Sequence, residues 1–266
     1  MAEDYLQLDD VRVSFDGFVA LAGVDLTVLQ SDLRFLIGPN GAGKTTLIDA
    51  ITGLTASTGL IDFSGNRLDG RRVAQIARLG VGRTFQTASL FEELTVLQHL
   101  DIAAGSARRP LSLLRRRRGL PSELGEVLEL IGLTDRAATP AGVLPHGEKR
   151  WLEIGMLLAQ RSRLLLLDEP VAGMSAAEKE RTGALLQRIA EDRSVIIVEH
   201  DMDFMRAYAK SVSVLARGRV LAEGTVAEVQ ANPEVQQAYL GTPIPEPVEG
   251  PEPVEGPDQV LAGREA

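Results

Sequence analysis

The sequence has few of the residues that crosslink a chain or bind transition metals. Its 266 residues include no cysteine and 3 histidines, which excludes disulfides, thiol chemistry and cysteine-based metal sites and leaves little for a histidine cluster. No apolar run approaches the ~20 residues needed to span a bilayer. The N-terminus is acidic and lacks the basic start of a secretion signal. We therefore expect a cytosolic protein.

The chain carries a formal net charge of −9, which argues against a nucleic-acid partner. From residue 242 onward six acids and one arginine give a net −5, and the sequence Glu-Pro-Val-Glu-Gly-Pro occurs twice in succession. This composition cannot bury a core, so we predict that residues 242–266 form a disordered tail. Arg108, Arg109 and the four arginines at 115–118 form a basic cluster. It is either a solvated loop or a contact for anionic lipid headgroups or an acidic partner.

A glycine-rich loop follows the apolar run at 33–37 and precedes a predicted helix over 44–51. Its pattern, G-x-x-x-x-G-K-[ST], predicts backbone N–H groups that surround phosphate oxygens, with the positive end of the helix directed at the same anion. Lys44 can reach the β- and γ-phosphates, and the Thr45 hydroxyl can bind Mg²⁺. We expect a bound nucleoside triphosphate to contact Gly38, Pro39, Asn40, Gly41, Ala42, Gly43, Lys44, Thr45 and Thr46.

Two acids follow a second apolar run. The leucines at 164–167 predict a strand buried on both faces. At its end Asp168 can hold the Mg²⁺ shell, and Glu169 can orient or deprotonate the attacking water. His200 follows the next predicted strand, over 195–198. A lone histidine there is usually structural, but beside a phosphate loop and an acid pair it favours a donor to the γ-phosphate.

The order of elements predicts an α/β fold. Alternating apolar residues between 6 and 28, with a turn at Asp16-Gly17, predict an antiparallel hairpin. Residues from about 72 to 144 have a helical pattern interrupted by glycine and proline, which we interpret as a smaller helical subdomain. Gln86 lies where the nucleotide-binding core gives way to this segment, and its side-chain carbonyl can sense Mg²⁺. The remaining predictions are helices over 150–160 and from 175 to about 191, and a hairpin around Arg217-Gly218.

Together these residues resemble an ABC-transporter ATPase subunit over roughly residues 5–241. In that family's terms 38–46 are the Walker A loop, Gln86 the Q-loop, Asp168 the end of Walker B, Glu169 the catalytic glutamate and His200 the switch histidine. The resemblance implies catalytic roles for Glu169, His200 and Gln86, and metal contacts from Thr45, Gln86 and Asp168. It also implies ATP and Mg²⁺ as cofactors.

The resemblance implies a P-loop NTPase core with a mixed sheet, an N-terminal antiparallel β-subdomain and an inserted α-helical subdomain. The ATPase domain would cover 1–241, with the helical subdomain inserted at about 87–160. Phe15 matches the aromatic residue that stacks on adenine, although a core strand residue would fit the same pattern.

One motif departs from the family pattern. The family's signature, Leu-Ser-Gly-Gly-Gln at the start of a helix, reads Leu144-Pro145-His146-Gly147-Glu148 in this chain. The family's serine donates its hydroxyl to the γ-phosphate bound by the opposite subunit, and Pro145 has no hydroxyl. A helix N-terminus still directs N–H groups at the anion, so Pro145, His146, Gly147 and Glu148 are expected to contact that ATP. A lost hydrogen bond to a charged group, worth ~1.5–3 kcal/mol, would slow hydrolysis without abolishing it.

The stretch from His146 to Met156 resembles the urea-uptake branch of the branched-chain amino acid transporter ATPases. This implies an ATP-hydrolysing subunit of an importer for urea or branched-chain amino acids, at the cytoplasmic face of the membrane. Its partners would be a second ATPase subunit, identical or paralogous, two membrane permeases and, indirectly, an extracytoplasmic solute-binding protein. The alternatives are an ABC ATPase that powers export of another cargo, and a nucleotide-gated regulatory subunit that scarcely hydrolyses ATP.

Overall fold

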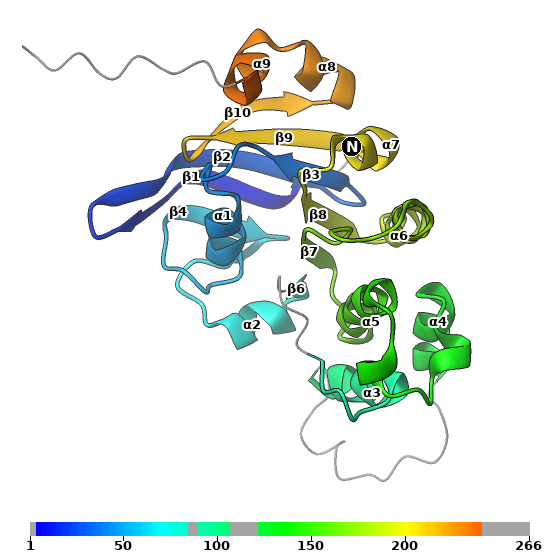
Figure 1. Cartoon of the computed structure of the whole chain (residues 1–266). Coiled ribbons are helices and arrows are strands. Elements are labelled where there is room, and N and C mark those ends of the chain that lie inside the picture. The colour runs from blue at the N-terminus through cyan, green and yellow to red at the C-terminus, as the bar shows by residue number, and fades with distance from the viewer. Residues whose placement is uncertain (1–3, 85–89, 107–121, 241–266) are drawn as a thin grey trace, which may run out of the picture.

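The computed structural model describes residues 4–84, 90–106 and 122–240, and shows two β-sheets with helices packed on them (Figure 1). Within these residues no helix is both long and apolar enough to cross a membrane. The predicted tail, the arginines at 115–118 and Gln86 lie outside the described residues.

The N-terminal sheet is antiparallel and has the strand order β2-β1-β4-β5. The predicted hairpin forms its first half, and the turn between its strands uses Asp16 and Gly17, both with positive φ. Two successive residues of positive φ give the turn a twist that matches the twist of the strands. The strands are β1 (Asp4–Phe15), β2 (Phe18–Leu29), β4 (Thr58–Phe63) and β5 (Asn66–Arg67).

The central sheet has the order β10-β9-β3-β8-β7-β6. Its strands run parallel except β10, which pairs antiparallel with β9, so the sheet is mixed as predicted. The strand β6 lies inside the segment for which the sequence predicts helices. The sequence does not reveal this strand, because three residues are too few to show a strand period. The strands are β3 (Leu33–Ile37), β6 (Val81–Arg83), β7 (Leu164–Asp168), β8 (Ser194–Val198), β9 (Ser211–Ala216) and β10 (Arg219–Gly224).

The continuous apolar runs of the central strands serve two separate cores. In β7, Leu165 and Leu167 pack into one hydrophobic cluster, and Leu164 and Leu166 pack into the other. The same alternation holds in β8, because successive side chains of a strand point to opposite faces. The first core joins the sheet to α5, α6 and α7, and the second joins it to α1 and the N-terminal sheet.

Helices cover both faces of the central sheet. Figure 1 shows α3, α4 and α5 grouped at one end of the molecule, and α8 and α9 at the other. The helices are α1 (Lys44–Ile51), α2 (Val73–Arg78), α3 (Val96–Ser106), α4 (Ser122–Leu130), α5 (His146–Ala159), α6 (Ala176–Ile189), α7 (Met202–Tyr208), α8 (Val226–Ala231) and α9 (Pro233–Leu240), with 3-10 turns η2 (Thr134–Arg136) and η3 (Ala141–Val143).

The helix α5 begins four residues earlier than its apolar pattern predicts. Pro145 is its N-cap residue, with φ −56° and ψ 159°, and the first turn contains His146, Gly147 and Glu148. These three residues carry no apolar side chain. The spacing of apolar residues therefore cannot predict the first turn, although its backbone is helical. The helix α6 ends at Ile189, two residues before its predicted end, and begins with a capping box between Ser175 and Glu178.

Candidate nucleotide site

The glycine-rich loop connects β3 to α1, and two of its glycines are required by close backbone contacts. Gly38 has φ 151°, and a Cβ there would lie 2.0 Å from the carbonyl oxygen of Leu215. Gly43 is the N-cap of α1 with φ 101°, and a Cβ there would lie 2.7 Å from the carbonyl oxygen of Ala20. The loop is thus held against two other strands, which fixes where the N-terminus of α1 points.

Lys44 is the first residue of α1 and folds back over this loop. Its Nζ donates to the carbonyl oxygens of Gly38, at 2.7 Å, and Pro39, at 3.0 Å. Burial lowers the pKa of Lys44, while the charges of Glu169 and Asp168 act in the opposite direction. The ammonium group therefore lies between the loop and the two acids, where an anion would be bound by the N–H groups of α1 and by Lys44.

Asp168 ends β7 and is 2% exposed. Its Oδ2 has no hydrogen-bond partner and lies 3.8 Å from Nη2 of Arg83, which also pairs with Asp49. Burial raises the pKa of Asp168, and the charge of Arg83 opposes that shift. A buried carboxylate oxygen without a hydrogen bond is costly unless a ligand occupies it. Mg²⁺ prefers one or two carboxylates with water and phosphate oxygens, and this donor fits that preference.

Glu169 and His200 meet at the ends of β7 and β8. His200 Nδ1 lies 3.5 Å from Oε1 of Glu169, and both side chains are open to solvent. The backbone of Glu169 has φ 47°, which is uncommon for a residue other than glycine. Its N–H donates to the carbonyl oxygen of Val198 at 2.9 Å. The two side chains predicted to activate water and contact the γ-phosphate are thus adjacent, and a ligand can reach both.

Phe15 lies at the end of β1, beside the hairpin turn, and is 48% exposed. It is therefore not a core residue, and its ring is available for stacking. Its role in binding a base stays a prediction.

The residues at 145–148 surround the N-terminus of α5. His146 Nε2–H donates to the carbonyl oxygen of Ala172 at 3.1 Å, in the loop that follows β7. Gly147 is buried against Glu178, whose Oε1 would lie 2.5 Å from a Cβ at that position. Glu148 pairs with Arg136 at 3.6 Å. Because α5 and α1 pack on opposite faces of the central sheet, this helix start and the phosphate loop belong to different faces of one chain.

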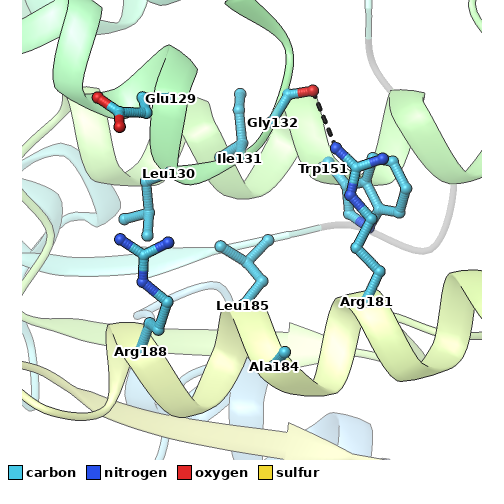
Figure 2. A pocket seen from close by; sticks show the side chains of 9 residues that line it. All are labelled: Glu129, Leu130, Ile131, Gly132, Trp151, Arg181, Ala184, Leu185 and Arg188. Carbon is cyan, nitrogen blue, oxygen red and sulfur yellow. Dashed lines mark hydrogen bonds between the residues drawn. The ribbon is translucent and has the colours of Figure 1, made fainter.

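A cavity of about 270 Å³ lies between α6 and the segment that joins α4 to η2 (Figure 2). On its wall the Arg181 guanidinium lies 4.0 Å from the centre of the Trp151 ring and donates to the carbonyl oxygen of Gly132 at 2.9 Å. Trp151 Nε1 donates to Thr182 at 2.9 Å. These contacts hold α5 against α6. Helix α6 begins at Ala176, directly after the loop that carries Glu169.

Glu199 is a buried acid that motif spacing does not single out. It follows β8 directly and is 2% exposed, between the loops that carry Glu169 and His200. An acid directly after a buried strand is an available signal, but its partners are visible only in three dimensions. Together, the loop, Lys44 and the acids at two neighbouring strand ends define a nucleotide-binding protein of the P-loop class.

Comparison with known proteins shows to which family of P-loop proteins the chain belongs. Residues 21–172 match the family described as ABC transporter, and residues 219–244 match one described as branched-chain amino acid ATP-binding cassette transporter. The chain is 35% identical over 254 residues to BraF, a high-affinity branched-chain amino acid transport ATP-binding protein of Pseudomonas aeruginosa, covering 91% of this chain and 99% of that one. It is 34% identical to LivG of Escherichia coli strain K12, a protein with the same description, over 91% and 99% of the two chains.

Solved structures support the same assignment. The ADP conformation of an ATP-binding cassette from an ABC transporter has a TM-score of 0.78 and 29% identity, covering 90% of this chain and 100% of that one. An ABC transporter component from Clostridium perfringens has a TM-score of 0.76 and 27% identity, covering 90% and 96%. The chain belongs to the ABC transporter family of ATP-binding subunits and is an ATPase. The predicted fold class is confirmed.

Proposed function

We propose that this subunit couples ATP hydrolysis to uptake of a small polar solute through membrane permeases. The observation that carries the catalytic assignment is the meeting of Glu169 and His200, at 3.5 Å, beside the buried Asp168. In this assignment Glu169 orients and deprotonates the attacking water. His200 donates to the γ-phosphate, and Lys44 and the loop N–H groups bind the phosphates.

Mg²⁺ would be held by Asp168 and the Thr45 hydroxyl, with Gln86 as the third proposed contact. When bound, it neutralises charge on the phosphate oxygens. The support within this chain is the buried Oδ2 of Asp168, which accepts no hydrogen bond, and the exposure of Thr45 in the first turn of α1.

We infer that the working form contains two ATPase subunits. Residues 145–148 and the phosphate loop lie on opposite faces of one chain, so one molecule cannot present both to the same nucleotide. A second subunit, turned to place its α5 N-terminus over the loop, would complete the site. ATP then favours the closed pair only by the contacts that it gains there.

The cargo is proposed from the relatives. Both BraF and LivG are described as branched-chain amino acid transport proteins, and the C-terminal match over 219–244 has the same description. We propose a branched-chain amino acid importer, with urea as the second cargo to be tested, because the stretch from His146 to Met156 resembles the urea-uptake branch. The subunit would work at the cytoplasmic face with two permeases, and a solute-binding protein would deliver the cargo outside.

The helical segment at about 87–160 is the proposed docking site of the permeases. A groove of about 190 Å³ lies between β6 and α5 and is lined by Leu90, Met156 and Gln160 among others. Phe91, which follows Leu90 in the chain, is 63% exposed. Exposed apolar side chains next to a groove are typical of a surface that binds another protein.

Replacing Glu169 by Gln tests the catalytic assignment. The variant should bind ATP as the wild type does, release phosphate at least about 100-fold more slowly, and accumulate as a dimer with ATP on size exclusion. His200→Ala should also lose hydrolysis with ATP binding retained. Normal phosphate release by Glu169→Gln would show that another group activates the water.

The cargo is tested with this subunit and the permeases and solute-binding protein that assemble with it, reconstituted in liposomes that contain ATP. Uptake of labelled leucine and of labelled urea is measured separately, with Glu169→Gln as the control without hydrolysis. Leucine uptake that depends on ATP supports the amino-acid proposal, and urea uptake alone supports the urea branch. Uptake of neither solute would contradict both.

A further inference from the structure

Glu199 connects the two loops that carry the proposed catalytic side chains. Its Oε1 accepts a hydrogen bond from the backbone N–H of Val171 at 3.3 Å. Its Oε2 accepts from the backbone N–H groups of His200, at 3.0 Å, and Asp201, at 3.2 Å. Val171 lies two residues after Glu169, so one carboxylate joins the segment after β7 to the segment after β8.

A carboxylate is the side chain suited to this position. A buried acid costs free energy unless its oxygens are hydrogen-bonded, and burial raises the pKa of Glu199 against the effect of the three N–H groups. Both oxygens face donors, and among side chains of this length the ionised carboxylate alone has two oxygens that only accept. Glutamine would place an NH₂ group against one of the two loops.

We propose that Glu199 is a positioning residue that sets the separation of Glu169 and His200. The inference rests on the catalytic roles proposed above for those two residues. Glu169 has a left-handed backbone, φ 47°, and such a conformation persists only where its surroundings hold it. On one side its N–H is bonded to Val198. On the other side the bond from Val171 to Glu199 fixes the chain, and the same carboxylate fixes the backbone of His200.

The experiment compares Glu199→Gln with Glu199→Asp and Asp32→Asn in phosphate-release assays. In Glu199→Gln the amide oxygen can serve His200 and Asp201 while the NH₂ group meets the N–H of Val171, so one loop is released. We expect kcat to fall about 10- to 100-fold, while KM for ATP changes less than about threefold. Glu199→Asp keeps two accepting oxygens and should recover part of kcat.

Asp32→Asn is the matched control. Asp32 is also a buried acid, 8% exposed, and bonds Arg34 and Ser211 at the other end of the central strands. Its variant should lose stability without a comparable loss of kcat. Amide hydrogen exchange supplies a second readout. Glu199→Gln should speed exchange in residues 169–174 and 199–202 and leave α1 unchanged.

Three results would overturn the inference: kcat of Glu199→Gln within twofold of the wild type, no recovery by Glu199→Asp, or faster exchange throughout the chain. If Glu199→Gln does not fold, Glu199→Asp still decides, because a shortened carboxylate should lower kcat at constant KM. A failure of the proposed catalytic roles can be distinguished from a failure of this inference about Glu199. If the catalytic roles are wrong, Glu169→Gln and His200→Ala will retain hydrolysis.

Discussion

Single residues at the nucleotide site are arranged at a cost to the stability of the free protein. Asp168 is buried with one oxygen that accepts no hydrogen bond, and Glu169 has a left-handed backbone. Each of these features costs free energy in the absence of ligand. They persist because β7 and β8 are buried on both faces and hold their ends firmly. The strand ends thus present charged groups in a fixed position before ATP arrives.

The phosphate loop offers a test at this scale. In Gly38→Ala the new Cβ would collide with the Leu215 carbonyl at 2.0 Å, so we expect the free energy of unfolding to fall by at least about 2 kcal/mol. Gly41→Ala is the control, since Gly41 also has positive φ, 77°, but has no atom within 4 Å of the added Cβ. It should lose about 1 kcal/mol from backbone strain. Urea unfolding without nucleotide measures both, and equal losses would contradict the collision argument.

The sequence predicts those site residues that carry their context along the chain. Lys44, Asp168 and Glu169 are readable because a strand, a loop and an acid follow one another. Glu199 and Arg181 are not, because the partners of Glu199 include Val171, 28 positions away, and those of Arg181 include Gly132, 49 positions away. Charged residues that act through backbone groups of a distant loop leave no local pattern.

At the scale of elements, the spacing of apolar residues predicts where helices and strands begin and end. It fails where the first turn of a helix contains no apolar residue. The pattern finds β7 and β8 because each contains a continuous apolar run, and it finds the N-terminal hairpin because apolar residues alternate along its strands. It misses the first turn of α5, and it misses β6, whose pairing with β7 depends on Gly82 fitting against Ser162. The missed turn is part of the proposed dimer contact, where polar residues are expected.

The contact of α5 with α6 predicts how much the Arg181 side chain contributes to the stability of the protein. Arg181→Met keeps the alkyl chain but loses the guanidinium from Trp151 and from the Gly132 carbonyl (Figure 2). We expect a loss of about 1–2 kcal/mol of unfolding free energy. Arg188→Met is the control, because the Arg188 side chain lines the same cavity and makes no hydrogen bond or ion pair with the described residues. It should change stability by less than about 0.5 kcal/mol. Equal effects in urea unfolding would count against the contact.

The start of α7 predicts a pH dependence. A hydrogen bond from Lys179, together with the N–H groups of Phe204 and Asp203, lowers the pKa of Asp201. A lowered pKa means that the stabilising effect is complete above the unfolded value of about 3.9 and is lost as pH falls through the folded value. Asp201→Asn keeps an oxygen for the helix cap but cannot pair with Lys179.

The stability of Asp201→Asn should therefore lie below that of the wild type at neutral pH, and the gap should close below about pH 4. Urea midpoints measured across this range provide the comparison. Asp203→Asn is the control, because the side chain of Asp203 is 92% exposed and its pair with Arg206 is a surface one, worth little. A gap for Asp201→Asn that widens as the pH falls would reverse the sign argued here.

At the scale of the whole molecule, we propose that one chain presents two incomplete halves of a nucleotide site. In this proposal the phosphate loop and the acids bind one side of ATP, while α5 packs on the other core, at the opposite face of the central sheet. The contacts of α5 with α6, and of His146 with the Ala172 carbonyl, tie this helix start to the loop after Glu169. In the proposed dimer, a nucleotide on the partner subunit would therefore be connected, through these side-chain contacts, to the loop after Glu169 of this one.

Pro145 provides the test of that arrangement. It is the N-cap of α5 and has no side-chain donor, while its extended backbone, φ −56° and ψ 159°, suits serine equally well. In a dimer of this chain, Pro145→Ser would place a hydroxyl toward the γ-phosphate of the partner. A hydrogen bond to a charged group is worth ~1.5–3 kcal/mol, so turnover should rise about 10- to 150-fold.

Pro145→Ala, which has no hydroxyl, should not show this rise. A similar rise in both variants would place the effect in the helix rather than in a bond to phosphate. No rise in Pro145→Ser, with ATP-dependent dimers still formed, would mean that the α5 N-terminus does not face the reacting phosphate.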